Sequence, residues 1–92
     1  MSSVVSVTKR DITKGLPDDP EACPIARAIN RLVKKSVGVQ VIGDDGVEFT
    51  HKDKFYVRKL PKKALNFIYD FDTGEAVEPI EFNLNIPEAL LK

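Results

Sequence analysis

The residues that decide the fold run from 24 to 60, PIARAINRLVKKSVGVQVIGDDGVEFTHKDKFYVRKL. The stretch opens at Pro24, a favourable first helical residue because its missing N–H would have no partner there. Apolar residues then recur at the spacing of one helix face: Ile25, Ala28, Ile29, Leu32 and Val33. We therefore expect an amphipathic helix whose last turn holds Lys34 and Lys35 and which stops at Gly38.

Three short alternating segments follow this helix, and they predict strands over 37–42, 47–50 and 55–60. Polar and glycine-containing turns at 43–46 and 51–54 separate them and favour hairpins. In the third strand, Phe55 and Val57 share one face, while Tyr56 and Arg58 share the other.

The pattern extends outward on both sides. Residues 3–8 read as a strand with Val5 and Val7 on one face, and Thr8 caps a short helical turn closed by Gly15. Residues 16–23 are a loop. Pro61 opens a second helix that stops at Gly74, and 80–86 alternates as a final strand before a short tail at 88–92.

The element order is strand, short helix, helix, three strands, helix and strand. It predicts a single α+β domain over residues 1–92. We expect a mostly antiparallel sheet of four to five strands, with the two main helices packed on one face.

Composition narrows the class of protein further. Of the 92 residues, 42% are apolar and 30% are charged, with a net charge of zero, which is an ordinary globular mixture. There is no apolar run near the length of a membrane span, and the N-terminus does not resemble a secretory signal. A single cysteine excludes an internal disulfide, so we expect a cytoplasmic protein without membrane contact.

The charge is unevenly distributed along the chain. Residues 27–63 hold ten lysines and arginines against four acids, whereas residues 64–92 hold six acids against one lysine. Asp70 and Asp72 lie near the end of the second helix, where negative charge opposes the helix dipole. We expect them to form salt bridges with the basic middle of the chain.

Ordered residues across the chain carry a resemblance to a known group. They comprise Val7-Thr8, Asp11-Ile12 and Gly15, then Cys23-Pro24-Ile25-Ala26, Ala28-Ile29 and Arg31, then Leu60-Pro61, Ala64, Phe67-Ile68, Phe71-Asp72, Gly74, Val77, Pro79 and Phe82. The set resembles a family of small uncharacterised proteins of bacteria and their phages. The resemblance implies a shared small α+β fold and supplies no activity.

Few residues point to catalysis. Cys23 precedes a helix, where the dipole lowers a thiol pKa, so it is a weak candidate nucleophile in a thiol-dependent enzyme. A small buried cap is the favoured interpretation, since the one histidine, His51, lies in a distant turn. The sequence predicts no metal and no cofactor, because it has no phosphate loop and no metal-ligand spacing.

The basic middle is the stronger indication. Tyr56 and Arg58 share a strand face beside Lys62 and Lys63 at a helix start, which suits a nucleotide-like anion. An alternative is nucleic-acid binding through the first helix by Arg27, Arg31, Lys34 and Lys35, together with the 52–63 surface. We therefore expect a non-enzymatic binding or interaction module. It would form a homo-oligomer and either sequester a small anionic ligand or dock on a host protein.

Overall fold

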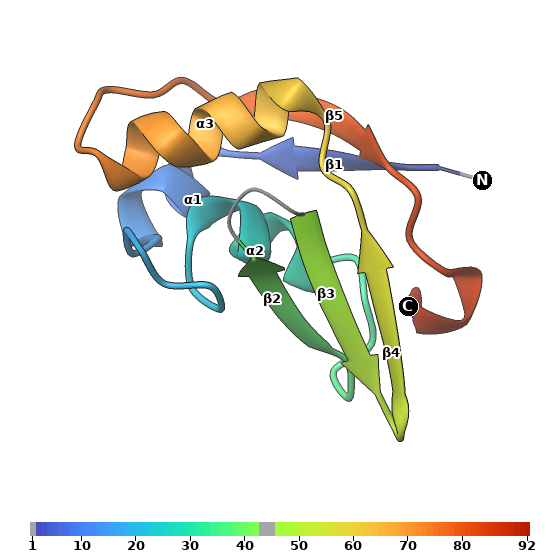
Figure 1. Ribbon diagram of the computed structural model, residues 1–92. Helices are drawn as coiled ribbons and strands as arrows, with labels where there is room; N and C mark the ends of the chain where they lie inside the picture. The colour runs from blue at the N-terminus through green and yellow to red at the C-terminus, as the bar shows by residue number, and fades with distance from the viewer. Residues whose placement is uncertain (1, 43–45) are drawn as a thin grey trace.

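The computed structural model describes residues 2–42 and 46–92 and divides the described strands into two antiparallel sheets (Figure 1). One sheet pairs β1 (Ser3–Val7) with β5 (Ile80–Leu84). The other has the order β2 (Gly38–Ile42), β3 (Gly46–His51) and β4 (Lys54–Arg58). The α+β class is thus confirmed, but the expected single sheet of four to five strands is wrong.

The two main helices contact different strands. Helix α2 (Pro24–Asn30) packs against both β1 and β2, so it lies between the two sheets, and α3 (Lys62–Asp72) packs on β5 (Figure 1). Each two- or three-stranded sheet has too little area to form a core alone. The shared core forms around α2, where Ile25 and Ile29 are fully buried.

Helix α2 ends at Asn30, four residues before Lys34 of the predicted last turn. The apolar residues after α2 do not extend the helix but contact the C-terminal segment. Val33 forms an isolated bridge with Leu91, and the Lys34 N–H donates to the carbonyl of Leu90 at 2.9 Å. The predicted tail is therefore a packed segment containing the 3-10 helix η2 (Glu88–Leu90), which buries Leu90 completely. Lys34 and Lys35 lie beyond the helix.

Several local expectations are confirmed. Val5 and Val7 are buried on one face of β1, and helix α1 (Lys9–Lys14) begins at the cap Thr8 and ends before Gly15. Gly74 has a φ of 86°, which suits the residue after α3. The predicted turn at 43–46 falls mainly on residues outside those described.

The expected salt bridges of the acidic end are not formed within the described residues. The Asp72 carboxylate accepts a hydrogen bond from the Asp18 N–H at 3.0 Å, and both ion pairs of the described chain end on Asp11. Asp72 thus fastens the 16–23 loop to α3 through a backbone group. A nearby N–H satisfies the carboxylate without ordering a long cationic side chain.

Candidate functional site

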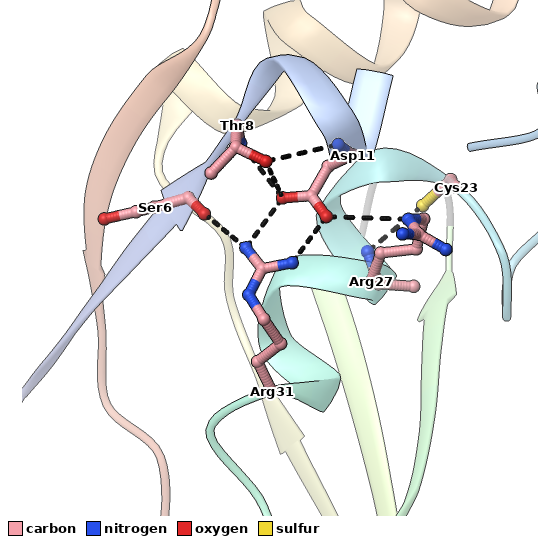
Figure 2. A network of polar contacts seen from close by, with 7 residues as sticks. Ser6, Thr8, Asp11, Cys23, Arg27 and Arg31 are labelled. Atoms are coloured by element: carbon pink, nitrogen blue, oxygen red, sulfur yellow. Dashed lines mark hydrogen bonds and ion pairs between the residues drawn. The ribbon is translucent and has the colours of Figure 1, made fainter. Parts of the chain in front are cut away.

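A buried carboxylate organises the contact between α1 and α2 (Figure 2). Asp11 is completely buried, and its Oδ2 accepts from the Thr8 N–H at 2.9 Å and from the Thr8 hydroxyl at 3.2 Å. The Asp11 N–H in turn donates to the Thr8 hydroxyl at 3.2 Å. This reciprocal capping box forms although aspartate replaces the more usual glutamate.

Two arginines of α2 and its C-cap reach the same carboxylate. Arg31 donates from Nη1 to Oδ1 at 2.5 Å and from Nη2 to Oδ2 at 2.7 Å, and its Nη2 also donates to the Ser6 carbonyl at 2.9 Å. The Nε of Arg27 lies 3.5 Å from Oδ1. Because Ser6 belongs to β1, Arg31 joins three elements at one point.

These contacts set the charge state of Asp11. Burial by itself would raise the pKa of Asp11, but hydrogen bonds from Arg31 and Thr8 and the positive charge of Arg31 outweigh burial. The pKa of Asp11 therefore lies below its ordinary value. The carboxylate is charged at neutral pH and acts as a structural ion, with no free lone pair directed at solvent for use as a general base.

Cys23 is the N-cap of α2. Its Sγ accepts from the Ala26 N–H at 3.4 Å, and the residue is buried. Burial raises the pKa of the Cys23 thiol, and the hydrogen bonds from the backbone of Ala26 and Ile25 do not restore it. His51 instead contacts the Ser36 hydroxyl at 3.4 Å. The geometry gives Cys23 the role of a helix cap.

The four residues of the predicted anion site make different contacts. Arg58 donates from Nε to the Asn85 carbonyl, and Lys63 donates from Nζ to the Glu81 carbonyl, both at 3.0 Å. Tyr56 packs against the core, and Lys62 is exposed. Glu81 lies in β5 and Asn85 just beyond it, so two of the four candidates cover carbonyls on the β5 side of the molecule.

The predicted nucleic-acid face is also divided. Arg27 and Arg31 face Asp11, while Lys34 and Lys35 are exposed beyond the helix. The two groups therefore do not form one helical stripe. Within the described residues, no cluster of three histidine, cysteine or acidic side chains is placed to hold a metal ion. Helices long and apolar enough to span a bilayer are likewise absent from the described part of the chain.

A surface that the sequence did not single out lies on β4. Phe55 is 70% exposed and Val57 is 53% exposed, whereas the alternate residue Tyr56 packs inward beside its register partner Phe49. Since β4 has β3 on one side only, it is an edge strand of its sheet. Sequence alternation predicted two faces for this strand but could not show which one is buried.

The backbone of this edge is also directed outward. Lys52 and Asp53 form the two-residue turn between β3 and β4, so the flanking His51 and Lys54 close the hairpin as a hydrogen-bonded pair. Alternation then directs the N–H and C=O groups of Phe55 and Val57 away from β3. Consistent with this, the Val57 carbonyl accepts from Nη1 of Arg58 at 3.0 Å.

No family model, curated protein or solved structure matches this chain. The geometry of the described residues therefore carries the functional argument. The features that this geometry defines are a buried ion pair between α1 and α2, a capped helix and an apolar sheet edge.

Proposed function

We propose that the protein is a non-enzymatic interaction module that docks on a partner protein by adding a partner strand to the free edge of β4. The observation that carries the proposal is the exposure of Phe55 and Val57 on a strand whose backbone groups also point outward. An exposed apolar edge is a template for strand pairing, which soluble proteins usually block. Strand addition combines main-chain hydrogen bonds with alternating side-chain contacts, and at Val57 an N–H of the partner would replace Nη1 of Arg58 as the donor to the carbonyl.

The surroundings of the edge favour an acidic partner strand. Three lysines near it are exposed, Lys52, Lys54 and Lys59, against one exposed acid, Asp53. Cationic side chains around an apolar centre attract a strand that alternates acidic and apolar residues and repel a basic one. Pairing with an acidic strand thus satisfies both the backbone and the charge.

A second copy of the chain is a poorer occupant of the same edge. Two β4 strands paired antiparallel about Tyr56 would place Lys54 opposite Arg58 of the other copy at both ends, and like charges directly opposite each other are destabilising. The homo-oligomer that the sequence predicted is therefore the less favoured use of this edge, and it has to be tested separately. Mass measured by light scattering over a range of protein concentrations distinguishes it.

Binding of designed peptides tests the proposal. We expect a short peptide of alternating glutamate and valine to bind, and a peptide of alternating lysine and valine not to bind, by fluorescence anisotropy. Replacing Phe55→Ser and Val57→Ser should weaken binding at least about tenfold, since both apolar contacts are lost. Val4→Ser is the matched control, because Val4 is 56% exposed on β1 and lies outside the edge.

Two outcomes oppose the proposal. Equal affinity for the two peptides would mean that the lysines do not select the partner. Equal weakening in the Val4→Ser control would mean that binding depends on exposed apolar area in general and not on β4.

The other functions carry less support from the structure. A nucleotide-like ligand at Tyr56, Arg58, Lys62 and Lys63 would have to displace the hydrogen bonds of Arg58 and Lys63 to carbonyls. Nucleic-acid binding would show an affinity that falls steeply with added salt, which gel shifts at two salt concentrations detect. The single free thiol suits a reducing cytoplasm, and we propose a bacterial or phage setting from the resemblance of the sequence.

A further inference from the structure

A second surface, separate from the β4 edge, carries three arginine side chains where α1 meets α2. A depression of about 490 Å³ is lined by two α2 residues, the α2 C-cap, one α1 residue and two loop residues: Arg27, Asn30, Arg31, Arg10, Glu21 and Ala22. Three of these six residues are arginines. The depression has room for a phosphate group with part of a small molecule attached to it.

The charges around the depression do not balance. Arg31 makes a two-pronged pair with Asp11, which fully engages this carboxylate together with Thr8. Arg27 stands 3.5 Å from the same carboxylate, and its Nε is buried without a hydrogen-bond partner among the described residues. Two arginines thus share one buried acid, which leaves a partly buried positive charge uncompensated.

The two charged groups at the rim offset each other, so the surplus of the depression is the one positive charge shared by Arg27 and Arg31. Arg10 is exposed at the rim, and the acid at the rim, Glu21, accepts a hydrogen bond from Gln40 at 3.3 Å. Nε of Arg27 is buried beside Asp11, so the terminal Nη groups of this side chain, which is 35% exposed, are the donors left for a ligand. Guanidinium groups bind phosphate oxygens with paired hydrogen bonds, and a phosphate group carrying one negative charge would offset the surplus.

We propose that this depression binds the phosphate group of a small molecule, with Arg27 and Arg10 as the direct contacts and Asn30 at its edge. Arg31 holds the floor of the site by keeping Asp11 engaged. The site is independent of the β4 edge, so peptide binding and phosphate binding are separable properties of the protein.

Titration with inorganic phosphate, pyrophosphate and adenosine monophosphate tests this site at constant ionic strength. We expect saturable shifts of the backbone amide NMR signals of Ala22 and Asn30, with one ligand bound per chain. Inorganic phosphate alone producing the shifts would identify a free phosphate site. Tighter binding of adenosine monophosphate would identify a nucleotide as the source of the phosphate.

Variants make the test specific. Arg27→Gln should weaken binding at least about tenfold through loss of a charged pair of hydrogen bonds. Arg10→Gln, at an exposed position, should weaken it by a smaller factor. Lys35→Gln removes the same charge outside the depression and should leave the affinity unchanged.

The proposal is overturned if no ligand gives saturable shifts. It is also overturned if Lys35→Gln weakens binding as much as Arg10→Gln, because that result indicates general attraction to a basic protein.

Discussion

Arg31 and Asp11 meet in a two-pronged ion pair, with Nη1 to Oδ1 at 2.5 Å and Nη2 to Oδ2 at 2.7 Å. The pair joins residues twenty positions apart and fixes the end of α2 against the start of α1. The carboxylate is fully buried, whereas the arginine side chain is about half exposed, at 48%. Removing the acid and removing the base therefore have different costs.

Asp11→Asn should lower the free energy of unfolding by about 3 kcal/mol, because it leaves two arginines facing a neutral amide. Urea unfolding at neutral pH measures the loss. Asp18→Asn, at an exposed loop position, is the matched control and should change stability by less than about 0.5 kcal/mol. Similar losses in both variants would contradict a special role for Asp11.

Acid should destabilise the protein through the same residue. The pKa of Asp11 is lower in the folded than in the unfolded chain, so its contribution is fully present above about pH 4. The contribution is lost as the pH falls through the lowered folded value. Between neutral pH and pH 3, the free energy of unfolding should fall less steeply with pH for Asp11→Asn than for the natural sequence. The same slope in both proteins would refute the linkage.

Gly15→Ala should destabilise the protein by about 1–3 kcal/mol, because an added methyl group has no space. A Cβ at this position would lie 2.6 Å from Cδ of Pro24 and 2.7 Å from the carbonyl oxygen of Asp11. Thermal unfolding of Gly38→Ala supplies the control, since a Cβ there meets its nearest atom at an ordinary 3.6 Å. Comparable melting temperatures for the two variants would show that α1 and α2 adjust freely.

Cys23 should react slowly with iodoacetamide at neutral pH. Burial raises the pKa of its thiol and also blocks the reagent, so both effects act in the same direction. The rate in the folded protein is compared with the rate in urea. Labelling as fast in the folded state as in the unfolded state would restore the hypothesis of a nucleophilic cysteine.

Arg58→Ala and Lys63→Ala should each lower stability by about 1 kcal/mol, because each removes a hydrogen bond to a backbone carbonyl. Lys62→Ala removes an exposed lysine of the same cluster and should have little effect in the same urea titration. If instead all three variants leave stability unchanged, Arg58 and Lys63 are free to bind a ligand.

Local patterns in the sequence were sufficient to predict most elements. Short-range steric and hydrogen-bonding rules account for the cap at Thr8, the start of α2 at Pro24, the three strands β2, β3 and β4, and the helix after Pro61. The class of fold follows from their order. Each of these features depends on residues close together in the chain.

Features that depend on distant residues were not predictable. The end of α2 is set by the pairing of Val33 with Leu91, and the division into two sheets by the pairing of β1 with β5. The partner of Asp11 is equally remote, since nothing in the spacing of Arg31 distinguishes it from Lys34 or Lys35. Long-range contacts of this kind leave no periodic pattern in the sequence.

The candidate surfaces also depend on long-range contacts that the sequence pattern does not show. The basic residues at 58–63 were singled out for their charge, yet Arg58 and Lys63 contact carbonyls near β5. The apolar edge was missed because alternation does not show whether Phe55 or Tyr56 faces the core. Cys23 and Arg31, which the sequence offered as a nucleophile and a nucleic-acid contact, lie instead in the capping and ion-pair contacts of α1 and α2.

Hydrogen exchange at the two outward amides of β4 tests the central proposal most directly. On addition of the peptide of alternating glutamate and valine, the amide hydrogens of Phe55 and Val57 should exchange markedly more slowly. The amide of Tyr56, which already bonds to β3, should be almost unaffected by the peptide. Unchanged exchange at Phe55 and Val57 in the peptide-bound protein would contradict strand addition at this edge.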